Sequence, residues 1–205
     1  MILAEKSISV SNIVNGATRL QPVVLGIGEA AGVLATVALR EKKPLSAVSI
    51  RRVQQLLLEQ NAYIMPFLDM NPKDPHFQAM QKSGAAGILK GEGVPYLWAN
   101  QTWFYPDRQV SEFEVVEGLR PMYPQLKDYW GASGDSLTGA RLLVFLKMIQ
   151  PEITNENLRL AWENGALEGE FAWDKKLNRR EVAVVLDEVL DLSLIHISEP
   201  TRQAE

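Results

Sequence analysis

The sequence predicts a mainly α-helical chain, in which a short strand and a buried helix precede an all-α domain built from two repeats. Three observations support this class. An apolar stretch runs from Pro22 to Leu39, helix-capping residues and helical apolar spacing follow it, and part of the later segment repeats itself. With 205 residues, the chain is long enough for one or two domains.

The composition excludes several kinds of protein. An apolar content of 46% argues against a mainly disordered chain. A net charge of −4, with scattered lysines and arginines, argues against a nucleic-acid partner. The sequence holds no cysteine and only two histidines, His76 and His196. This excludes disulfides, thiolate zinc sites and multi-histidine metal sites within the chain, so no metal site is expected.

The C-terminal residues form a run that is foreign to the rest. Leu192 to Arg202 resemble the translation of a transposase-based sequencing adapter, and a natural apolar strand is the alternative. We therefore interpret residues 192–205 as a non-native tail and exclude them from the fold. Such a tail should make few core contacts despite its apolar residues Leu194 and Ile195.

The first region begins with an apolar, strand-like run, Met1–Ala4. The later stretch from Pro22 to Leu39 falls short of the about 20 residues of a membrane helix, and it contains Glu29. It predicts a buried helix and no membrane span. Its glycines, Gly26, Gly28 and Gly32, are costly in a helix and suggest that a sheet, a helix or a ligand approaches closely.

A polar segment leads into this helix. It contains Asn15–Gln21, and Pro22 suits the first helical turn. The start of a helix exposes unpaired N–H groups and a positive dipole, which favour anionic or carbonyl-rich ligands. A plain loop followed by a buried helix is the alternative.

These residues carry a resemblance. Ala4–Ser11, Asn15–Pro22 and Gly28–Gly32 together resemble the C-terminal end of the FAD-dependent oxidoreductase family, with its Thr-Arg-x-x-Pro and Gly-x-Ala-Ala-Gly blocks. In that family this last helix points its N-terminus at the flavin. Two positions depart from the pattern. Glu29 stands where glutamine is usual, and Asn12 replaces a frequent histidine, which puts a proton-transfer role there in doubt.

The resemblance implies a function for residues 1–42 as the end of an FAD-binding domain. The cofactor would be FAD in the full-length protein, acting on a small-molecule substrate, with the catalytic residues upstream. No Gly-x-Gly-x-x-Gly turn in a βαβ unit is present. The partner of this segment would therefore be the missing N-terminal FAD-binding portion. The implied cofactor-binding residues are Ser9, Asn12, Thr18, Arg19, Gln21 and Pro22.

Residues 43–191 predict a separate helical domain. Ser49 precedes an amphipathic helix over residues 50–58. Two copies of one unit then follow, at about residues 76–120 and 155–191. Each copy has a helix, a glycine turn, an aromatic residue expected to be buried, and a capped helix with an acid three residues after the cap. The matching positions are Gly87 and Gly165, Phe104 and Phe171, Ser111 and Asn178, and Glu114 and Glu181.

This unit resembles the S-layer-homology module, most closely at Asn178–Ala183. The resemblance implies a cell-envelope or glycan-binding module without catalytic activity. A helical appendage on the oxidoreductase is the favoured interpretation.

Three smaller features complete the sequence analysis. Asp69–Asp74 lacks the central glycine and final glutamate of a calcium loop, so a turn is expected. His76 is expected at the surface or as a helix cap. The aromatic residues Tyr96, Trp98 and Trp103 could stack on sugar rings or cover a substrate, but packing in a core or between domains is favoured.

Overall fold

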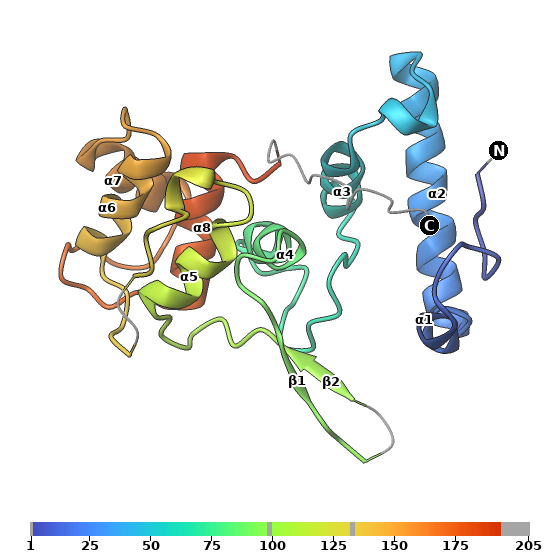
Figure 1. Cartoon of the computed structure of the whole chain (residues 1–205), viewed down its shortest axis with the longest axis horizontal. Helices are drawn as coiled ribbons and strands as arrows, with labels where there is room; N and C mark the ends of the chain where they lie inside the picture. The colour runs from blue at the N-terminus through green and yellow to red at the C-terminus, as the bar shows by residue number, and fades with distance from the viewer. Residues whose placement is uncertain (1, 98–99, 132–133, 194–205) are drawn as a thin grey trace. The chain divides into compact units, whose positions relative to one another are not determined.

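The computed structural model describes residues 2–97, 100–131 and 134–193. The chain is mainly α-helical, as expected, and divides into two compact units, at residues 1–62 and from residue 63 onward (Figure 1). The strands described lie in the second unit, and residues 2–4, the described part of the expected Met1–Ala4 strand, form no strand. A strand needs a pairing edge, and this segment has none within its unit.

The first unit contains α1 (Asn12–Thr18), α2 (Gln21–Glu41), the short 3₁₀ helix η1 (Leu45–Ala47) and α3 (Ile50–Glu59). Two predicted helix starts are confirmed. Pro22 lies in the first turn of α2, and the side chain of Ser49 accepts a hydrogen bond from the backbone N–H of Arg52. Helix α3 contacts α2 and buries Leu57 and Leu58. The expected division at residues 42 and 43 therefore falls inside this unit.

Helix α2 corrects the expectation of a buried helix. The buried residues of α2 are Ala31, Val37 and Ala38, whereas Leu25 and Leu39 are 74% and 79% exposed. Helix α2 contacts α1, η1 and α3, which leave most of its side chains uncovered. Within the described residues, α2 alone combines the length and the apolar composition that crossing a membrane requires, and core helices and N-terminal signal sequences share those properties.

The glycines of α2 likewise lack the expected close neighbour. A Cβ atom at Gly26 or Gly32 would meet nothing within 4 Å, and one at Gly28 would lie 3.5 Å from the carbonyl of Ala4. Since glycine costs about 1 kcal/mol relative to alanine in a helix, this unit does not explain the three glycines by itself.

The second unit contains five α-helices among its described residues, and a β-hairpin extends away from them (Figure 1). Strands β1 (Glu92–Val94) and β2 (Gln101–Trp103) are antiparallel, with Glu92 opposite Trp103. The helical elements are α4 (Phe77–Ala85), α5 (Glu112–Leu119), η2 (Pro124–Leu126), α6 (Gly139–Ile149), α7 (Asn155–Asn164) and α8 (Arg179–Leu190). His76 is the buried N-cap residue of α4, which confirms the helix cap among the two roles expected for it.

Three helix starts meet in a closed ring of backbone hydrogen bonds. The ring is formed by the buried residues that precede the caps of α5, α6 and α8, namely Val110, Leu137 and Leu177. The N–H of Val110 donates to the carbonyl of Leu177 at 3.2 Å. Leu177 donates to Leu137 at 2.8 Å, and Leu137 donates to Val110 at 2.7 Å. The two predicted helix starts, after Ser111 and Asn178, are confirmed, and α6 supplies a third that was not predicted.

Ion pairs join neighbouring helix starts in this ring. The third residue of α5, Glu114, pairs with the first residue of α8, Arg179. The third residue of α6, Arg141, donates to the first residue of α5, Glu112, at 2.9 and 2.7 Å. At the remaining junction, between α8 and α6, the first residue of α6 is Gly139, which has no side chain that could form an ion pair. The ring of Phe171 lies next to it instead.

In the second copy of the repeated turn, the residue with left-handed backbone lies one position later than expected. Gly87 and Ala166, not Gly165, adopt the left-handed backbone after α4 and α7, with φ of +75° and +50°. The following buried residues make the same contact in both copies. Ile88 donates to the carbonyl of Ser83 at 3.0 Å, and Leu167 donates to Trp162 at 3.2 Å.

Three further expectations need correction. Phe104 is fully buried, but Phe171 is only partly buried. Asn178 and Glu181 form the reciprocal capping box, whereas Ser111 caps α5 without it, because the carboxylate of Glu114 turns to Arg179. Leu192 is 1% exposed and so lies in the core, contrary to the expectation for the tail. Residues 194–205 lie outside the described residues.

Candidate functional site

A polar groove of about 550 Å³ lies in the second unit. It runs between the 71–76 loop, the turn after α7 and the start of α8. Its charged and polar lining residues are Asn71, Lys73, Asp74, His76, Asp107, Glu168, Asn178, Arg180 and Glu181. This site was not predicted from the sequence, since its residues come from four separate segments.

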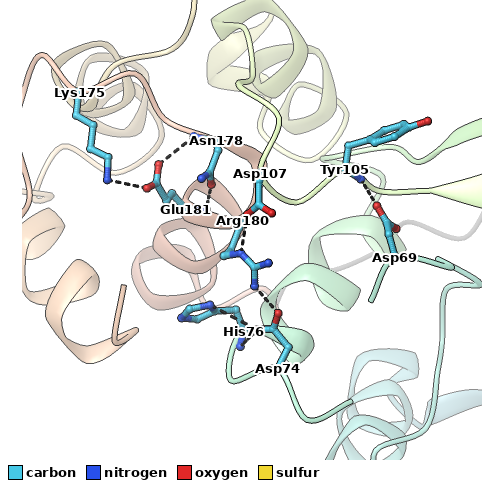
Figure 2. A network of polar contacts seen from close by, with 9 residues as sticks. All are labelled: Asp69, Asp74, His76, Tyr105, Asp107, Lys175, Asn178, Arg180 and Glu181. Carbon is cyan, nitrogen blue, oxygen red and sulfur yellow. Dashed lines mark hydrogen bonds and ion pairs between the residues drawn. The ribbon is translucent and has the colours of Figure 1, made fainter. Parts of the chain in front are cut away.

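Arg180 lines the groove and lies between the carboxylates of Asp74 and Asp107 (Figure 2). It is the second residue of α8, and its guanidinium pairs with Asp74 and donates to Asp107 at 3.2 Å. Burial lowers the pKa of Arg180, but the hydrogen bonds and charges of these two carboxylates outweigh burial and raise it. A basic residue in the first turn of a helix opposes the dipole. Two arginines directly after the capping residue Asn178 therefore indicate, from the sequence alone, that carboxylates elsewhere in the chain pair with them.

Asp74 is held by donors from two sides. Burial raises the pKa of Asp74, but the hydrogen bonds from Arg180 and from the backbone N–H of His76, at 2.8 Å, outweigh burial, and the charge of Arg180 helps to lower it. Ionised Asp74 therefore stabilises the folded chain above the ordinary carboxyl pKa of about 3.9. That contribution is lost as the pH falls through the lowered pKa of Asp74.

We expect Asp74→Asn to destabilise the chain at neutral pH by about 1–2 kcal/mol and to flatten its loss of stability in acid. Urea unfolding followed by circular dichroism at several pH values between about 7 and 2 measures both effects. The control is Asp128→Asn at an exposed carboxylate. If Asp74→Asn and the wild type lost stability in parallel down to the lowest pH, this role of Asp74 would be excluded.

The Asp69–Asp74 segment uses its oxygens on the chain itself. Asp69 accepts hydrogen bonds from the backbone N–H groups of Phe104 at 2.8 Å and Tyr105 at 2.6 Å, and Asn71 accepts one from Lys73 at 2.9 Å. The segment forms turns, as expected. Across the described ranges, no group of three metal-binding side chains comes together.

The predicted aromatic cluster is partly described. Trp103 stacks on Tyr105, with ring centroids 5.9 Å apart, and Tyr96 is 55% exposed. Trp98 lies outside the described residues. Tyr105 has a left-handed backbone, with φ of +55°, which Asp69 stabilises through the hydrogen bond to its N–H. The side chains of Trp103 and Tyr105 are partly exposed, so both sugar stacking and packing remain compatible with the cluster.

In the first unit, four of the predicted flavin-facing residues, Thr18, Arg19, Gln21 and Pro22, lie at the junction of α1 and α2, whereas Ser9 and Asn12 lie at the other end of α1. Ser11 caps α1 by accepting from the N–H of Val14 at 3.3 Å. Asn12 and Thr18 are consequently the first and last residues of a helix, where a loop was expected. Arg19 is the C-cap of α1 and is exposed, and Ser9 is exposed upstream of α1.

The start of α2 offers unused hydrogen-bonding groups. Its N-cap residue is Leu20, and no side chain among the described residues caps the helix. Gln21 and Pro22 form its first turn. The hydroxyl oxygen of Thr18 is shielded from solvent and has no hydrogen-bond partner in the described part of the chain. Together these groups provide donors and a positive dipole toward an acceptor-rich ligand.

The front of the chain is similar to one known protein family. Residues 1–57 match the family model FAD dependent oxidoreductase. The match supports an FAD-dependent oxidoreductase region at the front of the chain, extending through most of α3. No curated protein and no solved structure matches the chain.

The donor set at this junction fits FAD, the cofactor of that family. The uncapped start of α2 and the orphan hydroxyl of Thr18 suit the carbonyl-rich edge of a flavin or a phosphate. Arg19 is exposed and, among the described residues, makes no ion pair that would restrain it. When bound, FAD supplies the electron-transfer chemistry, and these residues would bind and orient it.

Proposed function

We propose that this chain is the C-terminal part of an FAD-dependent oxidoreductase. The first unit, residues 1–62, contributes the last flavin-facing loop and helix, and the second unit, from residue 63, contributes an accessory helical domain. The family match over residues 1–57 carries this proposal. The substrate is a small molecule, and the partner of the first unit is the N-terminal FAD-binding portion of the same protein.

The exposure of α2 supports this assignment. Leu25 is 74% exposed and Leu39 is 79% exposed, and Gly26 and Gly32 have open space above them. A helix with apolar residues and glycines on its open faces is suited to packing closely against further structure. In the proposed oxidoreductase, the remainder of the FAD domain covers these faces, so that α2 is a core helix and not a membrane span.

The experiment is the FAD content of the full-length protein. We expect it to purify with about one FAD per chain, released on denaturation and identified by absorbance and mass. The chain of 205 residues should bind FAD poorly, because its sequence lacks the turn that holds the pyrophosphate. A folded full-length protein that cannot be loaded with FAD would overturn the proposal.

A second candidate function concerns the helical domain. A cell-envelope or glycan-binding module related to the S-layer-homology family is supported by the polar groove around Arg180, which presents fixed donors and acceptors. Hydroxyl-rich ligands suit such a lining. Co-sedimentation of the full-length protein with cell-wall polysaccharide would favour this candidate if Arg180→Gln abolished it. Equal sedimentation of both forms would argue against the groove as the site.

A further inference from the structure

The β-hairpin has an outer face, opposite the buried ring of Phe67, and aromatic side chains gather on it. Successive side chains of a strand point to opposite faces of the sheet. The methyl group of Thr102 lies on the inner face, because a Cβ atom at Gly91 would meet both this methyl, at 2.9 Å, and the ring of Phe67. Gln101 and Trp103 therefore lie on the outer face, where the indole N–H of Trp103 donates to Oε1 of Gln101 at 3.0 Å.

The outer face continues beyond β2 as a stack of rings. Phe104 is fully buried, but Tyr105 after it again lies on the outer face. The rings of Tyr105 and Trp103 have an angle of 18° between their planes, and the guanidinium of Arg108 lies 4.9 Å from the centre of the Tyr105 ring. Glu92, which is paired with Trp103 across the hairpin, forms an ion pair with Arg108 at 2.8 Å. The aromatic face consists of the outer residues Gln101, Trp103, Tyr105 and Arg108.

The backbone of Tyr105 is held in a conformation that few residues other than glycine adopt. Its φ of +55° lies in the left-handed region. Asp69 stabilises this backbone by accepting hydrogen bonds from the N–H groups of Phe104 and Tyr105, at 2.8 and 2.6 Å (Figure 2). Backbone strain of this kind clusters at sites that bind ligands. Here it accompanies two aromatic rings, of Trp103 and Tyr105, that stay partly exposed to solvent.

The aromatic face suits an uncharged ring that is apolar on its flat side and polar at its edge. The rings of Trp103 and Tyr105 stack on one another, so they leave no slot between them for a proline-rich peptide. The charges of Arg108 and Glu92 neutralise each other, and the net charge of −4 disfavours phosphate-bearing ligands.

A β-linked sugar ring has the complementary chemistry. It presents C–H groups on its flat sides, which can pack on an indole, and hydroxyl groups around its edge. Because Oε1 of Gln101 accepts from Trp103, the amide NH₂ of Gln101 can donate to a hydroxyl. The half-exposed carboxylate of Glu92 can accept from another hydroxyl.

We propose that the aromatic face binds a neutral, β-linked oligosaccharide, with one sugar ring stacked on the indole of Trp103. Gln101 and the ion pair of Arg108 with Glu92 hydrogen-bond the hydroxyl groups at the edge of that ring. The proposal does not depend on the flavin assignment. It shares its class of ligand with the second candidate function, but it places the contact on the hairpin and not in the groove around Arg180.

Isothermal titration of the whole chain with neutral oligosaccharides tests the proposal. The probes are cellohexaose, xylohexaose, mannohexaose and chitohexaose. We expect at least one of them to bind with a dissociation constant of about 1 mM or below. Trp103→Leu keeps apolar bulk but lacks a flat ring, so it should weaken that binding about tenfold, whereas Trp103→Tyr should retain most of it. If no probe bound the wild type, the proposal would be overturned.

The matched control is Trp130→Leu, and circular dichroism checks that each variant is folded. Trp130 is 61% exposed, and the guanidinium of Arg120 lies 4.1 Å from its ring centre, so it is a second exposed indole beside an arginine. We expect Trp130→Leu to bind as the wild type does. Wild-type affinity in Trp103→Leu would contradict the aromatic face as the site.

Two further variants complete the test. If Trp103→Leu does not fold, Gln101→Ala takes its place, because it removes the amide donor and should weaken binding about fivefold. Wild-type affinity in Gln101→Ala would then overturn the proposal. If Arg180→Gln removed binding while Trp103→Leu kept it, the sugar would lie in the groove, and the second candidate function would survive without the aromatic face.

Discussion

Gly118→Ala should destabilise the second unit by about 3 kcal/mol, although alanine is the better helix former. Gly118 lies in α5, directly against the backbone of Ile88. A Cβ atom there would lie 2.1 Å from the carbonyl oxygen of Ile88 and 2.5 Å from its Cα. A backbone segment cannot swing aside as a flexible side chain can, so α5 must move away from the turn after α4.

Chemical denaturation followed by circular dichroism measures this effect. Gly93→Ala is the control, because Gly93 lies in the exposed strand β1 and a Cβ atom there would meet nothing within 4 Å. We expect Gly93→Ala to stay within about 0.5 kcal/mol of the wild type. If Gly118→Ala proved as stable as the wild type, the close packing of α5 on Ile88 would be wrong.

Glu114→Ala should cost about 3 kcal/mol, because it leaves a buried guanidinium without its carboxylate. Arg179 is 0% exposed, pairs with Glu114, and donates to the carbonyl of Lys90 at 2.7 Å. Its guanidinium also lies 4.6 Å from the ring centre of Phe104. Burial and, to a smaller extent, the charge of Arg108 together lower the pKa of Arg179 to about 10. Denaturant unfolding at neutral pH, where Arg179 is charged, measures the loss.

The matched control is Glu117→Ala on the same helix. Glu117 pairs with Arg120 across one helical turn, but its side chain is 42% exposed. Surface pairs of this kind contribute about 0–1 kcal/mol, so the control should unfold nearly as the wild type does. If Glu114→Ala and Glu117→Ala lowered the free energy of unfolding equally, burial of Arg179 would not strengthen the contribution of its ion pair.

The sequence was most informative about the local starts of helices. Pro22, Ser49, Ser111 and Asn178 mark helix starts that the structure confirms. These starts depend on interactions within one turn, which sequence spacing displays directly. The third start, at Thr138, was missed because arginine, not an acid, follows three residues later, at Arg141.

Long-range competition explains the other differences. The side chain of Glu114 has the spacing of a capping box, but it pairs with Arg179, far along the chain. The repeated turn could not be placed correctly by matching glycines, because Ala166 takes the left-handed position in the second copy. The exposed faces of α2 could not be foreseen from its apolar composition, since exposure depends on which elements are present to cover it.

The two candidate sites differ in how far the sequence could predict them. The residues proposed to face the flavin lie close together in the sequence, so the resemblance could name them, although not the helical form of residues 12–18. The groove around Arg180 collects side chains from distant segments, and only the basic residues in the first turn of α8 gave a signal. The sequence alone could not identify Asp74 and Asp107 as the partners of Arg180, because only the packing of the helices brings them together.

The measurement that tests the central claim most directly is the reduction potential of the bound flavin in full-length Arg19→Ala. Arg19 is exposed beside the uncapped start of α2, where a positive charge and the helix dipole would favour reduced, anionic flavin. We therefore expect Arg19→Ala to lower the reduction potential of the flavin and to decrease the amount of FAD bound per chain. Arg40→Ala, in the last turn of α2, should leave both unchanged. A potential and an FAD content in Arg19→Ala equal to those of the wild type would contradict the assignment of this junction to the flavin.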